Sequence, residues 1–460
     1  MPKSPVYDYD LICIGSGAGG NVAASIAAKK GKKVAIVDQA PKLGGECPNW
    51  GCVPTKALLR AAEHYEMAQN ASKYGINTGD VSFDYKKVKA WKDLAVHRTG
   101  TEDAEEFFES HNIDIYRGHA HFIDKHTVSV NKKRYKARKF LIATGTRSFI
   151  PPIENIEKAG YITYEEAIDF TKLPSTMAVI GGGAIGCEFA ELFATFGVKV
   201  TVFEATPRLL SREEPEVSEL VKALMIKRGL DVKTGTIVRK AEKHGKTKTT
   251  LHFNDHNHSG QLTVDSVLIA AGKIPNVDLG LENTGVEYDR HGVPTNEYMQ
   301  TNVKHIYAAG DVTGPYQFTH TASYQSRLAG NNMFTRKDHW QEADYHNIPR
   351  CVFTSPEAAS VGLTQAQIEE HGVKTKIGLA PVNTIGRSNT ENHSSGLVKI
   401  VCNTKGTILG ASIVAPHAGE MIHELAVAIK YQAHAHDIAN MVHAFPTWSE
   451  AVKVACASVK

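Results

Sequence analysis

Short apolar runs that end in glycines recur along the chain, and they predict strands that enter glycine-rich turns. The first apolar run covers residues 10–14. Three glycines follow it: Gly15, Gly17 and Gly20. Small residues then continue to about Lys30, and a second apolar run at 34–37 ends at Asp38. This pattern predicts a strand, a helix and a second strand that ends in an acid.

The same pattern occurs a second time. An apolar run at 178–180 leads into another set of glycines: Gly181, Gly183 and Gly186. A helical pattern reaches about Phe196, and a strand at 199–203 ends at Glu204. Such glycines allow the backbone to approach a pyrophosphate at a helix N-terminus, and the acid accepts hydrogen bonds from ribose hydroxyls. One glycine triplet is weak evidence, but two complete units predict two dinucleotide-binding folds.

The remaining elements are arranged around these two units. The buried runs at 140–145 and 267–272 end in small residues, and we expect each to close one nucleotide fold. A third such strand, at 305–311, is expected to lead into a helix. From Asn347 onward, short strands alternate with helices without nucleotide-type glycines. We therefore predict an α/β protein with two Rossmann-like domains and a C-terminal α+β domain.

Composition narrows the class of protein. A chain of 460 residues should form several domains. The net charge of +3 favours neither a nucleic-acid nor a membrane partner, and no apolar run approaches membrane-spanning length. The first residues hold no apolar stretch, so we expect no secretory signal and a cytoplasmic protein.

Two cysteines five positions apart, Cys47 and Cys52, suggest redox chemistry. A helix with Pro54 near its start follows Cys52, and a helix N-terminus favours thiolate over thiol. Cys47 lies on the preceding loop, where a thiol is more accessible. A zinc site is disfavoured because the sequence has no second close cysteine pair, and a structural disulfide because the chain looks intracellular. A dithiol beside two dinucleotides suggests a flavin and a nicotinamide, and we expect no metal site.

These motifs occur together, and in the same order, in one known family. The chain resembles the flavin-dependent pyridine nucleotide–disulfide oxidoreductases, which include dihydrolipoamide dehydrogenase, glutathione reductase and mercuric reductase. The resemblance also rests on the Ala-Gly-Asp motif at 309–311 and the Pro-Thr-x-x-Glu motif at 446–450. It implies a homodimer whose active sites use residues of both subunits. The implied domains are an FAD-binding domain (1–150), an NAD(P)-binding domain (151–274), a central domain completing the FAD site (275–345) and an interface domain (346–460).

The resemblance also implies roles for individual residues. Cys52 is similar to the thiol that forms a charge-transfer complex with the flavin, and Cys47 to the interchange thiol that meets the substrate. Lys56 resembles the lysine near the reactive flavin nitrogen, with Glu188 as its partner, and Asp311 resembles the aspartate that binds the ribityl chain. The other residues expected to bind the two nucleotides are Gly15, Gly17, Gly20, Asp38, Thr144, Gly145, Gly310, Gly181, Gly183, Gly186, Glu204 and Gly272.

The nicotinamide should be NADH. A carboxylate at Glu204 suits an unmodified ribose and repels a 2′-phosphate. Ala205 follows, at a position where NADPH-using relatives often carry arginine. Arg208 lies nearby, so NADPH stays open as the alternative.

The C-terminal tail departs from the family pattern. Thiol-handling relatives place an acid–base histidine directly before the proline, but here that position is Phe445. Glu450, which orients that histidine, is retained. Either His443 substitutes for it, although a displacement of two extended residues is about 7 Å, or the acceptor needs no such base. Mercuric reductases resemble the second case, yet their paired C-terminal cysteines are missing and only Cys456 is present.

We therefore expect an enzyme that passes electrons from NADH through FAD and the Cys47/Cys52 dithiol. The acceptor would be non-standard, as in mercuric reductase: a metal ion, a quinone or a disulfide. One alternative is dihydrolipoamide dehydrogenase, which Glu204 suits and Phe445 does not. The other is a redox-sensing or electron-carrier flavoprotein with low turnover and a protein partner.

Overall fold

The computed structural model describes residues 6–100, 102–245, 247–255 and 258–460, and the chain divides into two compact units. The first unit joins residues 1–57, 87–149 and 272–343, and the second joins residues 58–86, 150–271 and 344–460. The first unit thus holds the first glycine motif and the dithiol. The second holds the second glycine motif and the C-terminal segment. The domain boundaries at 150, 274 and 345 stay predictions.

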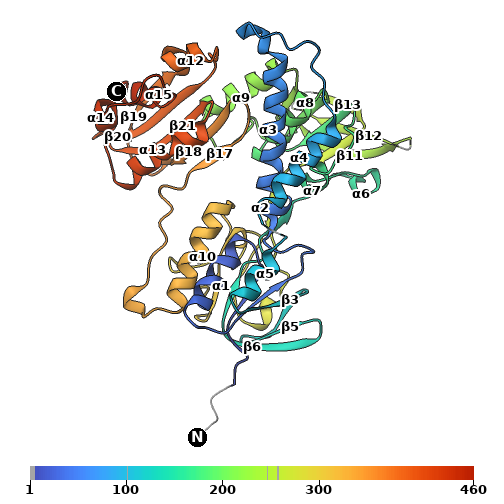
Figure 1. Ribbon diagram of the computed structural model, residues 1–460, viewed down its shortest axis with the longest axis vertical. Helices are drawn as coiled ribbons and strands as arrows, with labels where there is room; N and C mark the ends of the chain where they lie inside the picture. Colours follow the sequence, from blue (N-terminus) through green and yellow to red (C-terminus); the bar gives the residue numbers. More distant parts are fainter. Residues whose placement is uncertain (1–5, 101, 246, 256–257) are drawn as a thin grey trace. The chain divides into compact units, whose positions relative to one another are not determined.

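A seven-stranded sheet forms the centre of the first unit (Figure 1). Its order is β3-β2-β1-β6-β5-β4, with β16 against β6. Strand β1 pairs in parallel with β2 and β6, whereas β4, β5 and β6 pair antiparallel. The strands are β1 (Tyr9–Ile14), β2 (Val34–Asp38), β3 (Ile113–Arg117), β4 (Ala120–Asp124), β5 (Thr127–Val130), β6 (Lys133–Ile142) and β16 (Ile306–Ala308), with β7 (Thr146–Ser148) paired to β15 (Lys273–Pro275). The carboxyl ends of β1 and β6 therefore lie side by side.

Two helices of the first unit pack closely because small residues face each other. The Ala23 amide donates to Ser326 Oγ over 2.9 Å, and a Cβ added to Gly330 would lie 2.9 Å from Ala23 Cα. Ala23 is in α1 (Ala18–Lys29), and Ser326 and Gly330 are in α10 (Thr319–Met333), which Figure 1 shows side by side. The unit also contains α2 (Glu46–Asn49), α5 (Ala104–Ser110) and parts of α3 (Cys52–Gln69) and α4 (Tyr85–His97).

The second unit begins with another parallel sheet, in the order β10-β9-β8-β14. An antiparallel sheet, β11-β12-β13, accompanies it. These strands are β8 (Thr176–Ile180), β9 (Lys199–Glu204), β10 (Asp231–Thr234), β11 (Ile237–His244), β12 (Lys248–Asn254), β13 (Ser259–Val264) and β14 (Ser266–Ile269). The helices of this part are α6 (Ile156–Ala159), α7 (Tyr164–Ala167), α8 (Ala184–Thr195) and α9 (Pro215–Lys227).

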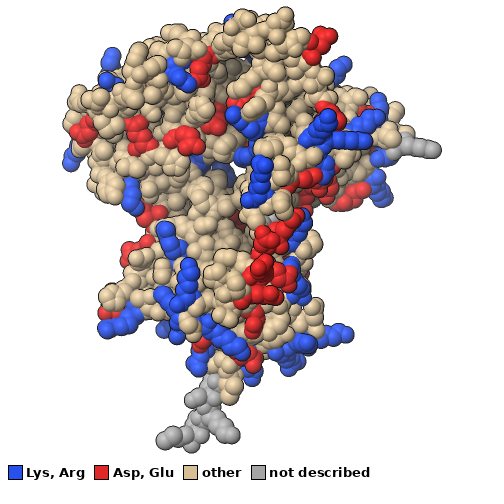
Figure 2. All heavy atoms as spheres, viewed as in Figure 1, with Lys and Arg blue, Asp and Glu red and all other residues tan. Residues whose placement is uncertain are grey.

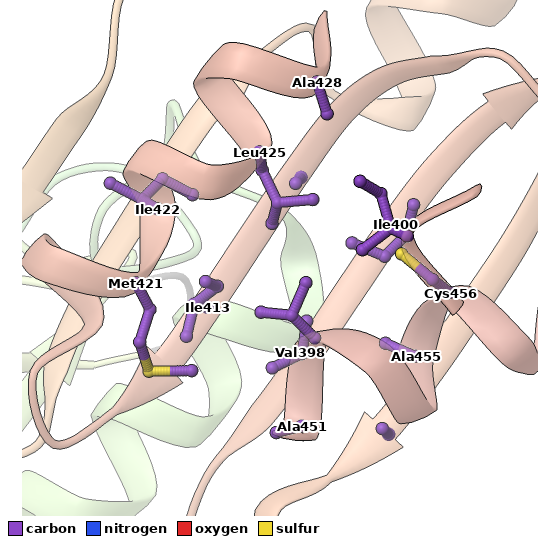
Figure 3. Close-up of a cluster of buried hydrophobic side chains, with 14 of the residues drawn as sticks. Val398, Ile400, Ile413, Met421, Ile422, Leu425, Ala428, Ala451, Ala455 and Cys456 are labelled. Atoms are coloured by element: carbon purple, nitrogen blue, oxygen red, sulfur yellow. The ribbon is translucent and has the colours of Figure 1, made fainter. Parts of the chain in front are cut away.

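The C-terminal part of the second unit is a five-stranded antiparallel sheet covered by helices. Its order is β17-β18-β21-β20-β19. Its elements are β17 (Arg350–Val352), β18 (Glu357–Gly362), α11 (Gln365–Glu370), β19 (Thr375–Pro381), α12 (Gly386–Thr390), β20 (Leu397–Asn403), β21 (Ile408–Ala415), α13 (Ala418–Lys430), α14 (Ala435–Asn440) and α15 (Glu450–Ala457). Figure 3 shows Leu425 of α13 and Ala451 of α15 directed at Val398 and Ile413 of the sheet. This cluster is the apolar core of the C-terminal part.

The predicted fold class is confirmed, and one predicted element is shorter than expected. The strand expected at 305–311 ends at Ala308, and the helix after it starts only at Thr319. Gly310 has φ 83° and Gly314 has φ 110°, so the backbone leaves the strand and turns twice before α10 begins. A 3₁₀ helix at Asp311–Thr313 lies between these glycines.

Charges of both signs are spread over the surface drawn in Figure 2, in keeping with a net charge of +3. Among the described residues, no helix is long and apolar enough to cross a membrane.

Candidate active site

The first glycine turn has a geometry that only glycine can adopt. Gly15 has φ 110°, and a Cβ added to it would lie 2.1 Å from the Ala143 carbonyl oxygen. A Cβ added to Gly20, in the first turn of α1, would lie 1.9 Å from the Gly15 oxygen. Strand β1, helix α1 and the end of β6 therefore pack so closely at this turn that no side chain fits between their backbones. This leaves the amide groups at the start of α1 facing the turn, as binding of a pyrophosphate requires.

The acidic residue at the end of β2 orders this turn. The Asp38 carboxylate accepts hydrogen bonds from the Ser16 amide at 2.8 Å, the Ser16 hydroxyl at 2.5 Å and the Ala40 amide at 2.8 Å. A carboxylate has about four lone-pair sites, so it can also accept from a ribose hydroxyl.

The second glycine turn repeats this design. Gly181 has φ 114°, and a Cβ added to Gly186 would lie 1.9 Å from the Gly181 oxygen. The Glu204 carboxylate accepts from the Gly182 amide at 2.6 Å and from the Thr206 amide at 2.7 Å. Both turns therefore fit a dinucleotide, because each combines a glycine cradle with an acid at the end of the second strand.

The other residues predicted for the first nucleotide lie where β6, β15 and β16 end. Thr144 and Asn276 exchange two hydrogen bonds, from Thr144 Oγ1 to the Asn276 oxygen at 2.7 Å and from Asn276 Nδ2 to the Thr144 oxygen at 3.0 Å. The Gly310 amide donates to Gln325 Oε1 at 2.7 Å. Burial raises the pKa of the Asp311 carboxyl, and the Thr146 hydroxyl donates to that carboxyl at 3.3 Å. A partly buried carboxylate with accepting capacity left fits the hydroxyls of a ribityl chain.

The dithiol lies directly beside the first glycine turn. Gly45 has φ 78°, and a Cβ added to it would lie 2.5 Å from Gly17 Cα. Two residues later Cys47 sits in α2, and Cys52 is the first residue of α3. This close approach places the cysteines at the predicted FAD site. Cys47 lies in a short helix and not on a loop, and it is less exposed than Cys52, the reverse of the accessibility expected from the sequence.

The two thiols differ strongly in acidity. The hydrogen bond from the Cys47 thiol lowers the pKa of Cys52 to about 6. Thr319 and Lys56 act in the same direction, while partial desolvation of the sulfur and the Glu46 carboxylate oppose them. The shared hydrogen bond and burial raise the pKa of the Cys47 thiol. These contacts favour the thiolate at Cys52 and the protonated thiol at Cys47.

Two contacts at the dithiol were not predicted from the sequence. The Thr319 hydroxyl, at the start of α10, lies 3.4 Å from Cys52 Sγ. The Glu46 carboxylate forms an ion pair with Lys273 of β15. Lys273 directly follows the predicted residue Gly272, but the sequence carries no signal for its partner.

Lys56 and Glu188 lie in different units, and their pairing stays a prediction. Lys56 is one turn after Cys52 in α3. Glu188 is buried in α8, where its carboxylate accepts from the Phe353 amide at 2.9 Å.

The tail residues occupy distinct environments. The side chain of His443 is 5% exposed, with Nε2 at 2.9 Å from a Glu424 carboxylate oxygen and Nδ1 at 3.1 Å from the Met441 carbonyl oxygen. Phe445, in contrast, is 77% exposed. Glu450 begins α15 and accepts from the Thr447 amide at 3.2 Å. Both ring nitrogens of His443 thus already have partners, whereas Phe445 faces outward.

Metal ligands are not gathered at any of these sites. Within the described part of the chain, no group of three or more His, Cys, Asp or Glu side chains is placed to hold a metal ion.

Comparison with known proteins identifies the family. Residues 9–326 match the model of the pyridine nucleotide-disulphide oxidoreductases, and residues 348–456 match the dimerisation domain of the same family. A mercuric reductase of Staphylococcus aureus is 34% identical over 451 residues, covering 97% of this chain and 82% of that protein. A dihydrolipoyl dehydrogenase of Bacillus subtilis is also 34% identical, over 462 residues, covering 97% of this chain and 96% of that protein.

A solved structure is similar over the whole length of the chain. The Cu(II) complex of the HOCl-induced flavoprotein disulfide reductase RclA from Escherichia coli has a TM-score of 0.88 and 28% identity, covering 99% of this chain and 100% of that one. The family is FAD-dependent and uses a pyridine nucleotide. Together with the two glycine turns and the dithiol, these matches show that the chain belongs to the pyridine nucleotide-disulphide oxidoreductase family and is an oxidoreductase.

Proposed function

We propose that the chain is a homodimeric, cytoplasmic flavoenzyme that passes electrons from NADH through FAD and the Cys47/Cys52 dithiol to a metal ion, a quinone or, less efficiently, a disulfide. The observation that carries the choice of acceptor is Phe445, which is 77% exposed at the position where thiol-handling relatives have their acid–base histidine. A phenyl ring can neither take nor give a proton. Sequence identity does not decide the acceptor, because a mercuric reductase and a dihydrolipoyl dehydrogenase are both 34% identical to this chain.

The acidity of the two thiols supports a dithiol that cycles. FAD, when bound, supplies the two-electron relay between the nicotinamide and the disulfide. A hydride brings two electrons and one proton, so reduction of a disulfide by one hydride leaves one thiol and one thiolate. Cys47 would hold that proton because its pKa is raised. Cys52, whose pKa is lowered to about 6, would remain the thiolate.

Apolar exposure supports the homodimer. The C-terminal domain, which matches the family's dimerisation model, exposes several large apolar side chains. The four most exposed are Val442 (93%), Phe445 (77%), Tyr431 (74%) and Val427 (57%). A second copy that covers these side chains would remove their apolar surface from water. It would also bring Phe445 to a site shared by two subunits.

His443 is poorly placed to replace the missing base. Its two ring nitrogens are engaged by Glu424 and by the Met441 carbonyl within its own unit. Transferring a proton to or from a thiol would require His443 to break at least one of these contacts. We therefore favour acceptors that need no positioned base.

A second candidate function is dihydrolipoamide dehydrogenase. Glu204 favours it because it suits NADH, as does the 96% coverage of the Bacillus subtilis enzyme. A redox-sensing or electron-carrier flavoprotein with low turnover stays the third interpretation.

Steady-state NADH consumption with a panel of acceptors tests the proposal. The panel contains Cu(II), Hg(II), a quinone, lipoamide and glutathione disulfide. We expect turnover with a metal ion or the quinone, and a rate with lipoamide or glutathione disulfide lower by about 10²–10⁴-fold, because a positioned base contributes about that much. A lipoamide rate as high as the metal and quinone rates would refute the proposal in favour of the dehydrogenase. Slow turnover with every acceptor would favour the carrier.

Two variants at one position isolate the missing base. Phe445→His should raise disulfide turnover, provided that Glu450 orients the new ring, while Phe445→Leu should not. Equal rates in both variants would show that the position does not limit proton transfer.

A further inference from the structure

Two helices begin at the dithiol, and each contributes a polar group. Helix α3 starts at Cys52 and α10 starts at Thr319, both within the first unit. The Thr319 hydroxyl lies 3.4 Å from Cys52 Sγ. It also lies within hydrogen-bonding reach of the Cys47 thiol. The hydroxyl is therefore shared between the two sulfur atoms that exchange electrons.

Hydrogen-bond chemistry fixes the direction of the contact in the reduced state. A thiolate can only accept a hydrogen bond, whereas a threonine hydroxyl has one proton to donate. When Cys52 is ionised, the donor must be Thr319. Hydrogen bonds to an ionised acceptor are stronger than those between neutral groups, so the contact favours the anion.

The charged groups around Cys52 are few and identifiable. The Lys56 ammonium, one turn along α3, favours the thiolate, and the Glu46 carboxylate on α2 opposes it. Glu46 is itself paired with Lys273, which reduces its effect. The Cys47 thiol donates to Cys52 from the same side. Thr319 differs from all of these because it carries no charge and does not titrate.

We propose that Thr319 is a catalytic residue whose hydroxyl holds Cys52 as a thiolate in the reduced dithiol. This inference deepens the proposed function, since it assumes that the dithiol is redox-active. Phe445 stands where thiol-handling relatives have the acid–base histidine, so this chain has no imidazole there to stabilise the thiolate. The Thr319 hydroxyl, which does not titrate, keeps Cys52 ionised instead.

Three variants separate the hydroxyl from packing. Thr319→Val removes the hydroxyl and keeps the shape, and Thr319→Ser restores it. Thr321→Val is the matched control, two residues along the same helix. Thr321 is fully buried, and its hydroxyl has no hydrogen-bond partner among the residues that the structure describes. Its loss should therefore leave the dithiol unchanged.

The first measurement is a pH titration of the long-wavelength charge-transfer absorbance in the reduced holoprotein. The second is the pH dependence of Cys52 alkylation by iodoacetamide, followed by mass spectrometry, in reduced protein with and without FAD. The midpoint of alkylation is the readout, because the plateau rate also changes with thiol basicity. Alkylation without FAD keeps the test independent of flavin binding and of NADH turnover.

We expect Thr319→Val to raise the midpoint by about one pH unit, a tenfold change in the thiolate-to-thiol ratio or about 1.4 kcal/mol. Thr319→Ser should titrate close to the natural protein, and Thr321→Val should be indistinguishable from it. Equal midpoints for Thr319→Val and the natural protein would overturn the proposal. Equal shifts in Thr319→Val and Thr319→Ser would also overturn it, by assigning the effect to packing. If NADH fails to reduce the flavin while the midpoints shift as expected, the proposed function fails and the role of Thr319 stands.

Discussion

Replacing Glu191 by glutamine should stabilise the protein by an amount that grows as pH rises from 5 to 8. Glu191 is 5% exposed in α8, and its carboxylate accepts from the Ser355 amide at 2.8 Å. Arg228, the cation that acts on this carboxylate, donates its hydrogen bonds to Glu66 and to the Ser355 hydroxyl. Burial raises the pKa of the Glu191 carboxyl from 4.5 to about 7, against the weaker opposing effects of Arg228 and the Ser355 amide.

The sign of the effect follows from linkage. Below pH 4.5 the carboxyl is protonated in both the folded and the unfolded chain, and its ionisation does not lower the free energy of unfolding. Between 4.5 and 7 the unfolded chain loses the proton first, so the free energy of unfolding falls as pH rises. A shift of this size lowers it by about 1 kcal/mol at pH 5, about 2 kcal/mol at pH 6 and about 3 kcal/mol at pH 8. Glutamine can still accept from the Ser355 amide but does not ionise.

The assay compares thermal unfolding midpoints of the Glu191→Gln variant and the natural holoprotein from pH 5 to pH 8. The advantage of the variant should grow by several degrees over this range, since about 1 kcal/mol corresponds to a few degrees. A lost hydrogen bond would shift the unfolding midpoint of the variant by the same amount at every pH. The decisive quantity is therefore the change with pH in the difference between the two midpoints. An advantage that does not change with pH would refute the reasoning.

A second buried glutamate is the matched control, with the opposite sign. Glu214 is paired with Lys399 at 3.0 Å, and their side chains are 2% and 3% exposed. Glu214→Gln removes the carboxylate charge that pairs with Lys399. Breaking a buried ion pair lowers the free energy of unfolding by about 3–5 kcal/mol. That variant should be less stable than the natural protein.

Three further predictions follow from the candidate site. Stoichiometric reduction should produce a charge-transfer band that is lost in Cys52→Ser. The band should fade as pH falls through 6, because the pKa of Cys52 is about 6. A band that persists in Cys52→Ser would show that another thiol forms the charge-transfer complex. NADH should reduce the flavin with a higher kcat/KM than NADPH because of Glu204; the reverse preference would point to Arg208, whose Nη1 is buried without a hydrogen-bond partner among the described residues. Light scattering should give a homodimer, and a stable, active monomer would contradict the predicted shared site.

The sequence predicted the nucleotide turns and the dithiol because their geometry is local. Gly15 and Gly181 take φ values of 110° and 114°, which only glycine tolerates, so the motif and the turn cannot be separated. Cys52 at the start of a helix was likewise readable from the residues around it. The strand expected at 305–311 was predicted too long because the turning effect of Gly310 was not recognised.

The residues that tune the site could not be found in this way. Thr319 is 267 positions from Cys52, Lys273 is 227 positions from Glu46, and Ser355 is 164 positions from Glu191. Each pair is brought together by strand order and helix packing, and no local pattern encodes that. Threonine, lysine and serine are also common on surfaces, so their identity alone gives no signal.

The raised pKa of Cys47 offers a physical reason to favour metal ions among the proposed acceptors. To attack a disulfide, Cys47 must first lose its proton, and the leaving thiolate must then gain one; the missing histidine performs both transfers in thiol-handling relatives. A metal ion changes this requirement, because a coordinating thiol is deprotonated outright by the charge of the ion. Coordination therefore releases the Cys47 proton to water. Transfer of the two electrons of the dithiolate to the metal acceptor re-forms the Cys47–Cys52 disulfide, so no thiolate is left to protonate. Quinones are intermediate, since they take up protons that water can supply. Phe445, the raised pKa of Cys47 and the lowered pKa of Cys52 therefore favour the same order of acceptors, with a metal ion first and a disulfide last.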